Sequence, residues 1–361
     1  MADRTEVLIR HFRDGDDRQI NDLFNRIFET DRSLQQWRWK FQADPASLAR
    51  PNYIVLGEAE GKIVSQYAGV ARDLWMRGEL RKAVQIVDNV IDPEFRGGRQ
   101  LQKQMFAFYG KHVLAQGNEF IFGCPNSIAY RVGKRLLGYD DVFSAPRLFR
   151  RLSLRLTLRR HLPAPLNAVA DALGRLSASA VRLVLRAGGR SRYRIAETID
   201  ERFDRLWDLA KERFTLLGVR DRKYLQWRYF RRPDARFRLL SAEGDDGLEA
   251  WVVLNVTQKV DGSRVGYVMD FLYLDPEVMQ QLLRRGLDEL SRMGADYAEA
   301  VAAPGSAGET LLREVGFGAR EGLEPVRMVI VWYAMKDEPS QSVVLNPRSW
   351  HLCHGDLDLE L

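Results

Sequence analysis

The chain has 361 residues, which is enough for two domains of ordinary size, and its 45% apolar and 29% charged content is typical of a soluble globular protein. No run of about 18 apolar residues occurs, so the composition argues against a membrane-spanning helix. The net charge of +6 conceals a local excess: residues 146–194 hold twelve arginines, no lysine and one acidic residue, against 43 basic and 48 acidic residues elsewhere.

The N-terminus and the cysteines point to a reducing compartment. The first residues are charged throughout and lack the apolar core of a signal peptide. Two cysteines, Cys124 and Cys353, make no disulfide framework. We therefore expect a cytoplasmic protein.

The first 82 residues predict a strand, a helix and then several antiparallel strands. Apolar spacing and turn residues give these ranges: strand 6–12, helix 18–28, hairpin strands 53–58 and 62–70, and short strands 74–76 and 80–82. Between the helix and the hairpin, Trp37, Trp39 and Phe41 have two interpretations, an acceptor pocket or core packing. A similar aromatic stretch recurs at Trp227 and Tyr229, which favours core packing.

The central segment, residues 84–139, predicts strand, turn, helix, strand and helix in that order. An apolar strand from Val84 to Ile91 ends at Asp92-Pro93, because proline cannot donate to a strand ladder. A Gly97-Gly98 turn leads into a helix to about Gln116. A strand at 119–123 and a helix at 127–137 follow. Glycines before a helix N-terminus let backbone N–H groups approach an anion such as pyrophosphate, although many such turns bind nothing.

This order resembles motifs A and B of the GNAT acetyltransferases. The parts that carry the resemblance are Pro93, the run from Arg96 to Leu101, Asn126-Ser127-Ile128-Ala129, and Gly138-Tyr139. In that family the glycine-rich turn binds the pyrophosphate of acetyl-CoA, and the second strand splays away from the first. The sequence departs from the pattern at Arg99, where the family has glycine, and at Leu101, where it has glycine or alanine.

The resemblance implies roles for particular residues. Asp88 on the central strand is the candidate general base, with an ion pair to an arginine as the alternative. In the family, the tyrosine that acts as general acid occupies the position of Gly133. Tyr130, one helical turn earlier, is therefore the candidate acid, with packing against the strand as the alternative. If neither candidate acts, solvent protonates the thiolate. Asn126 contacts the pantetheine or only forms a turn. The expected cofactor-binding residues are Ile91, Arg96, Gly97, Gly98, Arg99, Gln100, Leu101 and Asn126.

No metal is expected. His351, Cys353 and His354 lie within four residues and have no distant partner pair, which is a weak pattern for a metal site.

Landmarks of the first half recur in the second. Trp227-Arg228 matches Trp37-Arg38, Asp275-Pro276 matches Asp92-Pro93, and Gly316-Phe317 matches Gly138-Tyr139. Their offsets fall from 190 to 183 to 178 residues, as short deletions would produce. After Pro276 the second copy has neither glycine nor arginine, so it keeps the framework and lacks the phosphate loop.

We therefore expect an α/β (α+β) protein with two tandem GNAT-like, mainly antiparallel sheets of the bacterial tandem-GNAT type. The expected domains are residues 1–145, with the acyl-CoA loop, a basic helical connector at 146–193, and a degenerate copy at 194–361. The resemblance implies transfer of an acetyl group from acetyl-CoA to a primary amine. Two alternatives are a Fem-like aminoacyl transferase and a non-catalytic binding protein of the same fold.

The basic connector has apolar residues at helical spacing from Leu166 to Leu185. Such a helix lies on an anionic bilayer, grips an anionic substrate, or covers one of the two copies. Covering a copy is favoured, because apolar surface lies close by. Aromatic residues are few in the connector, so nucleic acid is not expected as a partner. Any contact of residues 146–194 with an anionic membrane surface is expected to be weak and salt-sensitive.

Overall fold

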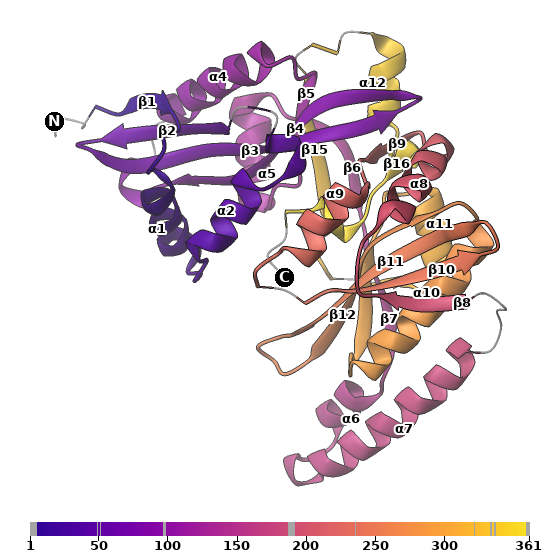
Figure 1. Cartoon of the computed structure of the whole chain (residues 1–361). Helices are drawn as coiled ribbons and strands as arrows, with labels where there is room; N and C mark the ends of the chain where they lie inside the picture. Colours follow the sequence, from indigo (N-terminus) through magenta and orange to yellow (C-terminus); the bar gives the residue numbers. More distant parts are fainter. Residues whose placement is uncertain are drawn as a thin grey trace. The chain divides into compact units, whose positions relative to one another are not determined.

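The structure is a computed structural model that describes residues 6–48, 50, 52–96, 99–186, 192–234, 236–320, 322–332, 334–335 and 337–358. The chain divides into two compact units (Figure 1). Unit 1 contains Met1–Phe143, Gln226–Asp234 and Arg327–Asn346, and unit 2 contains Ser144–Leu225, Ala235–Val326 and Pro347–Leu361. Within the described ranges, every helix is too short or too polar to span a bilayer.

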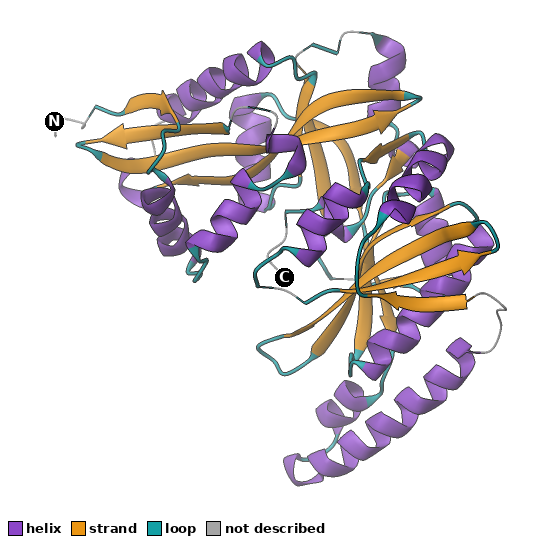
Figure 2. Cartoon of the chain, in the orientation of Figure 1, coloured by secondary structure: helices purple, strands orange, loops and turns teal. Residues whose placement is uncertain are grey.

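Unit 1 is built on a sheet with the strand order β1-β2-β3-β4-β5-β15-β6, in which β4 and β5 run parallel. Helices cover both faces of this sheet (Figure 2). Its elements are β1 (Leu8–His11), α1 (Asp17–Phe28), α2 (Leu34–Gln42), α3 (Pro45–Leu48), β2 (Tyr53–Ala59), β3 (Lys62–Met76), β4 (Glu79–Ile91), a 3₁₀ turn (Pro93–Phe95), α4 (Arg99–Ala115), β5 (Phe120–Gly123), α5 (Ser127–Val132), a π turn (Gly133–Leu137), β6 (Asp140–Ala145), a π turn (Gln226–Phe230), β15 (Val326–Trp332) and α12 (Glu338–Leu345).

Two tight hairpins set the register of the long strands in unit 1. Glu60 and Gly61 join β2 to β3, and Arg77 and Gly78 join β3 to β4, with positive φ at all four residues. Positive φ at both central residues defines the turn whose twist suits a two-residue hairpin. The local sequence thus places β4 in the middle of the sheet.

The two faces of the unit 1 sheet carry separate apolar cores. Residues of α1 and α2, including Ile20, Phe24 and Trp37, pack against one face of β2, β3 and β4. Residues of α4, including Met105 and Tyr109, pack against the other face with Val84 of β4. Strand β4 is therefore covered on both sides, which holds its backbone in a fixed position.

Unit 2 repeats this plan on a sheet with the order β14-β7-β13-β12-β11-β10-β8, in which β12 and β13 are parallel. Its elements are β7 (Arg147–Arg151), α6 (Arg155–His161), a 3₁₀ turn (Ala164–Leu166), α7 (Asn167–Arg186), β8 (Arg192–Ala196), α8 (Glu201–Ala210), a 3₁₀ turn (Lys211–Arg213), β9 (Leu216–Gly218), α9 (Arg222–Leu225), β10 (Arg238–Gly244), β11 (Gly247–Gln258), β12 (Arg264–Tyr273), α10 (Pro276–Arg292), β13 (Tyr297–Val301), α11 (Ala307–Glu314), β14 (Gly318–Ala319), two 3₁₀ turns (Pro347–Ser349, His354–Asp356) and, between them, β16 (Trp350–His351).

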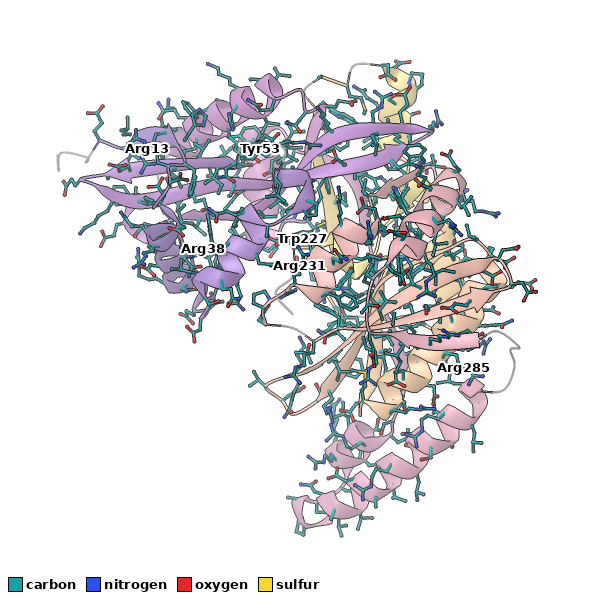
Figure 3. All side chains as sticks on the ribbon, viewed as in Figure 1. Arg13, Arg38, Tyr53, Trp227, Arg231 and Arg285 are labelled. Carbon is teal, nitrogen blue, oxygen red and sulfur yellow. The ribbon has the colours of Figure 1, made fainter. Side chains whose placement is uncertain are left out.

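The predicted fold class is confirmed, but the two units are not contiguous stretches of chain. Strand β7, expected within the connector, pairs with β13 in the sheet of unit 2. Strand β15, expected in the last domain, pairs with β5 in the sheet of unit 1. Residues Gln226–Asp234, which carry Trp227 (Figure 3), also belong to unit 1. The short strands β5 and β13 each need an antiparallel neighbour, and both obtain it from a segment distant in the sequence.

Candidate active site

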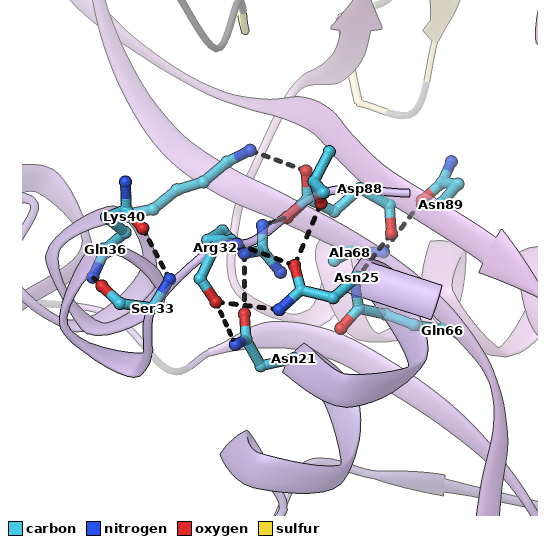
Figure 4. A network of polar contacts seen from close by, with 11 residues as sticks. Asn21, Asn25, Arg32, Ser33, Gln36, Lys40, Gln66, Ala68, Asp88 and Asn89 are labelled. Carbon is cyan, nitrogen blue, oxygen red and sulfur yellow. Dashed lines mark hydrogen bonds and ion pairs between the residues drawn. The ribbon is translucent and has the colours of Figure 1, made fainter. Parts of the chain in front are cut away.

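Strand β4 bends at Asp88, in the middle of the candidate site. The register of β4 against β3 shifts between Gln66 and Ala68, and Asp88 has a φ of +49°. Two side chains hold this bulge: the Gln66 amide donates to the Asp88 carbonyl at 2.6 Å, and the Asn89 carbonyl oxygen accepts from the Ala68 N–H at 3.0 Å (Figure 4). Bulges re-aim side chains next to functional sites.

The Asp88 carboxylate is ion-paired on both oxygens. Arg32 donates to Oδ2 at 2.5 Å and Lys40 to Oδ1 at 2.7 Å, while the Asp88 side chain is only 4% exposed. Burial by itself would raise the pKa of Asp88, but the charges of Lys40 and Arg32 outweigh it and hold the pKa below the ordinary aspartate value. A carboxylate stabilised in this way is a weak base, so the geometry favours the ion-pair interpretation over general-base catalysis.

Unit 2 contains the same arrangement around Asp270 on β12. Arg220 donates to Asp270 at 2.8 Å, and both side chains are fully buried. Arg32 immediately precedes Ser33, which caps α2, and Arg220 immediately precedes Asp221, whose side chain accepts from the Tyr224 N–H at the start of α9. An arginine before a helix cap that pairs with a central-strand aspartate is thus repeated where no phosphate loop exists. This repetition indicates a structural role for the pair.

Strands β4 and β5 separate just before Asp88. Pairing between β4 and β5 covers Ala83–Gln85 against Phe120–Phe122, whereas β4 continues to Ile91. Among the described residues, no β5 partner follows for the last six residues of β4, so this edge offers backbone N–H and C=O groups to a ligand. Helix α4 begins at Arg99, just beyond the end of this strand.

The described cofactor candidates lie at the turn between β4 and α4. The Arg96 guanidinium donates to the Ile91 carbonyl at 2.9 Å, so this side chain folds back on the strand end. Gln100 is exposed in the first turn of α4, whereas Leu101 is half-buried and packs against the core below α4. Gly97, Gly98 and the Arg99 side chain lie outside the described residues.

The equivalent turn of unit 2 is occupied by its own carboxylate. The Asp275 side chain accepts from the Glu277 N–H at 2.7 Å and from the Val278 N–H at 3.3 Å, at the start of α10. Those N–H groups are the ones that an anion at a helix N-terminus uses. Asp92, the counterpart in unit 1, also accepts from the Glu94 N–H at 3.1 Å, but there the capped segment is a short 3₁₀ turn before α4, whereas in unit 2 the Asp275 cap starts α10 directly.

Asn126 and Tyr130 both lie on α5 but have different surroundings. The Asn126 carbonyl oxygen accepts from the N–H groups of Ile128 and Ala129 at 3.1 and 2.9 Å, so this side chain caps the helix. Tyr130 is half-buried, and its ring lies 5.4 Å from the Arg327 guanidinium. A hydrogen bond to the Asp141 carboxylate is the main cause that raises the pKa of Tyr130. The phenol therefore keeps its proton at neutral pH.

The ring of Tyr139 explains the glycine at position 133. A Cβ on Gly133 would lie 2.1 Å from the ring of Tyr139, so no side chain fits there. The Tyr139 hydroxyl lies 2.9 Å from the Tyr67 hydroxyl, and burial raises the pKa of Tyr139 to about 12. The structure thus packs a buried tyrosine ring against Gly133, with its hydroxyl next to that of Tyr67.

Three buried residues of unit 2 are of types that bind metals, but the charge of their carboxylate is already compensated by an arginine. The ligand atoms of Asp270, His351 and Cys353 lie within 4.8 Å of one another. Asp270 is ion-paired with Arg220, and Nε2 of His351 lies 2.8 Å from the Phe271 carbonyl. A guanidinium in contact with the carboxylate opposes a second cation, so we assign no metal to this cluster.

The sequence analysis missed Arg32, Lys40 and the register of the repeat. Arg32 and Arg220, Ser33 and Asp221, and Trp39 and Trp227 are each separated by 188 residues. Matching Trp227 to Trp37 at an offset of 190 was therefore two residues out of register. The arginine that precedes the cap in both halves was the signal that would have given the correct alignment.

Comparisons with known proteins agree with this geometry. The model of the acetyltransferase (GNAT) domain matches residues 8–137. No curated protein matches the chain in sequence. Similar solved structures include the N-myristoyltransferase of Saccharomyces cerevisiae with bound myristoyl-CoA, at 12% identity and a TM-score of 0.58, over 91% of this chain and 83% of that chain.

Two bacterial structures are also similar. A probable N-acyltransferase from Enterococcus faecalis has 12% identity and a TM-score of 0.63, over 92% of this chain and 74% of that chain. A GCN5-related N-acetyltransferase from Kribbella flavida has 16% identity and a TM-score of 0.60, over 91% of this chain and 72% of that chain. At such identities the likeness shows the fold. The sequence match is to the acetyltransferase (GNAT) domain, and it covers residues 8–137 of the chain.

Proposed function

We propose that the chain transfers an acetyl group from acetyl-CoA to a primary amine, and that unit 1 alone binds the cofactor. The observation that carries this proposal is the gap between β4 and β5, which lies within the GNAT-matched residues and opens just before the N-terminus of α4. A pantetheine arm needs backbone partners and a pyrophosphate needs a cluster of N–H donors. These two features lie next to each other along the chain.

The cofactor is proposed to lie along the free edge of β4. Its pyrophosphate binds the Gly97-Gly98 turn and the first N–H groups of α4, at Arg99, Gln100 and Leu101. Arg96 adds positive charge at the same turn, where its guanidinium is held by the Ile91 carbonyl. Asn126 caps α5 through its carbonyl oxygen, so its amide N–H groups are the part proposed to contact pantetheine.

In the proposed reaction the protein forms no covalent bond to the substrates. A neutral amine nitrogen attacks the thioester carbonyl carbon, the C–S bond breaks, and the thiolate takes up a proton while the new amide nitrogen loses one. Tyr130 is proposed as the proton donor, because it is protonated at neutral pH. Asp88 is the weaker of the two assignments, because Arg32 and Lys40 already bind its carboxylate; without it, solvent accepts the amine proton.

The second unit is proposed to be a degenerate copy that binds no CoA. Its helix α10 starts directly at the Asp275 cap, and its sequence after Pro276 has no counterpart of Gly97-Gly98. A cytoplasmic location is proposed on the basis of two cysteines that form no disulfide, Cys124 and Cys353. Contact of residues 146–194 with an anionic membrane is a separate proposal, because acyl transfer does not require it.

Isothermal titration calorimetry with acetyl-CoA tests the cofactor assignment. We expect one molecule bound per chain, and loss of binding in Gly98→Asp, which adds bulk and a like charge at the phosphate turn. Unchanged affinity in Gly98→Asp, or two molecules per chain, would contradict the proposal. Mass spectrometry of a metabolite extract incubated with the protein and acetyl-CoA then identifies the acceptor; binding without any acetylated product would indicate a non-catalytic GNAT-fold protein.

A further inference from the structure

Helix α7 of unit 2 has two apolar faces, and only one of them is covered. Ala170, Ala178 and Leu185 are buried, in a helix that packs against α6 and α10. Gly174 marks the contact with α6, because a Cβ at this position would lie 2.7 Å from Cβ of Arg155. The Ser153 hydroxyl, just before α6, donates to the Gly174 carbonyl at 3.1 Å. The helix is thus fixed to unit 2 by its small residues.

The larger apolar residues of this region point away from unit 2. The exposed stripe is defined as six residues, with these exposed fractions: Leu166 42%, Val169 48%, Leu173 44%, Leu176 66%, Leu183 73% and Val184 65%. The sequence analysis favoured burial of these residues against a copy, and that expectation is wrong for the exposed stripe. A contiguous apolar patch on a helix indicates an interaction surface.

Two arginines of α7 lie outside the exposed stripe. At about 100° per residue, the six positions of the stripe span an arc of roughly 100° around the helix. Arg175 and Arg182 fall about 80–100° beyond one edge of this arc, between the stripe and the buried face, by the same rotation per residue. Figures 1 and 3 show α6 and α7 as a helical hairpin that extends from the body of unit 2 with side chains around it.

The charge of the hairpin region is almost entirely positive. Residues 146–194 contain twelve arginines and one acidic residue, Asp171. That carboxylate is used within the hairpin, because Arg159 donates to both of its oxygens at 2.8 and 2.6 Å. Asp296 and Glu299, outside the segment, pair with Arg155 and Arg147, so the excess of positive charge comes from the other arginines of the segment.

From the exposed stripe and the arginine excess of the hairpin region, we propose that α7 is a peripheral docking element for an anionic lipid bilayer. The leucines enter the boundary between head groups and acyl chains, and the positive charge of the hairpin attracts the lipid phosphates. This inference goes beyond acyl transfer and does not depend on it.

A second copy of the chain is the less suitable occupant of the same stripe. Pairing two α7 helices would bring together two hairpins that each have an excess of arginine, and Asp171, the one acidic residue of α7, is already paired with Arg159. An arc of about 100° is also wider than the narrow seam of a coiled-coil pair. Anionic lipid satisfies both the apolar residues and the arginines.

Vesicle flotation of the full chain tests the proposal. We expect binding to phosphatidylcholine vesicles that contain about one third phosphatidylglycerol, at least tenfold weaker binding to pure phosphatidylcholine, and release at high salt. The double variant Leu176→Asp/Leu183→Asp removes the apolar insertion and is expected to abolish flotation. Arg175→Glu/Arg182→Glu is expected to weaken binding to the anionic vesicles only.

The control is Leu209→Asp on α8, which places the same charge at another leucine that is 55% exposed. It is expected to bind vesicles as the unmodified chain does. Equal flotation of Leu176→Asp/Leu183→Asp and the control, or no preference for anionic lipid, would overturn the proposal. So would a concentration-dependent dimer in sedimentation velocity that only the Leu176→Asp/Leu183→Asp change abolishes. Acetyl-CoA titration of the same variants is expected to be unchanged, which separates this proposal from the proposed function.

Discussion

Trp39 and Trp227 donate hydrogen bonds to each other's backbone. Nε1 of Trp39 donates to the Trp227 carbonyl at 2.8 Å, and Nε1 of Trp227 donates to the Trp39 carbonyl at 2.9 Å. Their rings stack with centroids 5.3 Å apart. The two residues occupy equivalent positions of the repeat, 188 residues apart, and both belong to unit 1. A segment from the middle of the chain is thereby fixed to α2.

Replacement of either tryptophan by phenylalanine removes one of these hydrogen bonds and leaves a carbonyl without its donor. We expect Trp39→Phe and Trp227→Phe each to lower the free energy of unfolding by about 1–2 kcal/mol. Because the two side chains share the stack and both bonds, the double variant is expected to lose less than the sum of the two. Urea denaturation of the two single variants and the double variant measures this double-mutant cycle, and additive losses would show that the two residues are not coupled.

Asp88→Asn distinguishes a structural role from a catalytic one. It leaves Arg32 and Lys40 buried without their counter-ion, so we expect a loss of about 3–5 kcal/mol in the free energy of unfolding. Asp270→Asn, next to Arg220 in the unit without a phosphate loop, is the matched control and is expected to destabilise unit 2 in the same way.

The outcome that would restore Asp88 as the general base is specific. It is normal stability in Asp88→Asn together with a large fall in kcat and loss of the acidic limb of the pH–rate profile. Thermal unfolding and initial rates of the same preparation supply both measurements.

Gln100→Glu tests the anion site at α4 without disturbing the helix. A negative charge in the first turn is favourable for the helix dipole but repels a phosphate, so stability is expected to hold while acetyl-CoA affinity falls about tenfold. Gln116→Glu makes the same change just after the opposite end of α4, at another exposed glutamine, and is expected to leave affinity unchanged. Equal calorimetric affinities of the two variants would contradict the phosphate assignment.

Gly133→Ala introduces a methyl group into the ring of Tyr139. The backbone at Gly133 is helical, with a φ of −59°, so the expected loss of about 1–3 kcal/mol comes from overpacking alone. Tyr139→Leu in the same chain is expected to recover part of this loss. If Gly133→Ala is as stable as the unmodified chain in thermal unfolding, then the ring does not occupy this position.

Two buried histidines make unit 2 sensitive to acid. Burial, with help from nearby cations, lowers the pKa of His351 and of His354 to about 3, while the unfolded chain binds the proton near pH 6.5. Their contribution to stability is therefore complete above pH 6.5 and falls by about 1.4 kcal/mol per pH unit for each histidine between pH 6.5 and 3. His354→Phe removes one of the two protons taken up on unfolding, so it is expected to make the fall of stability with decreasing pH less steep. Urea titrations at pH 7.5, 6.5 and 5.5 measure this dependence. A stability that is independent of pH over this range would contradict the assignment.

The order of elements was predictable because it rests on local signals. The helix predicted after the glycine turn and ending at about Gln116, and the strand from 119 to 123, correspond closely to α4 and β5. Apolar periodicity, Asp-Pro and the glycine turns determine such elements within a few residues. The family resemblance followed from the same stretch and was confirmed.

The pairing of distant segments was not predictable from those signals. Nothing local in Val326–Trp332 distinguishes a neighbour of β5 from a neighbour of β13, because both need an apolar antiparallel strand. The partners of Asp88 were hidden for a similar reason: Arg32 and Lys40 precede it by 56 and 48 residues, and only the folded chain brings them together. The exposed stripe of α7 was interpreted as a buried face because spacing alone does not say which of two apolar faces is covered.

The origin of β15 also constrains how the chain is made. While a ribosome is still producing residues 152–325, β5 lacks the strand that pairs with Phe120–Gly123 in the finished protein. An apolar strand edge left open during synthesis invites pairing with other nascent chains. Unit 1 therefore reaches its final form only when β15 has left the exit tunnel, and a truncation before β15 would damage unit 1 as well as unit 2.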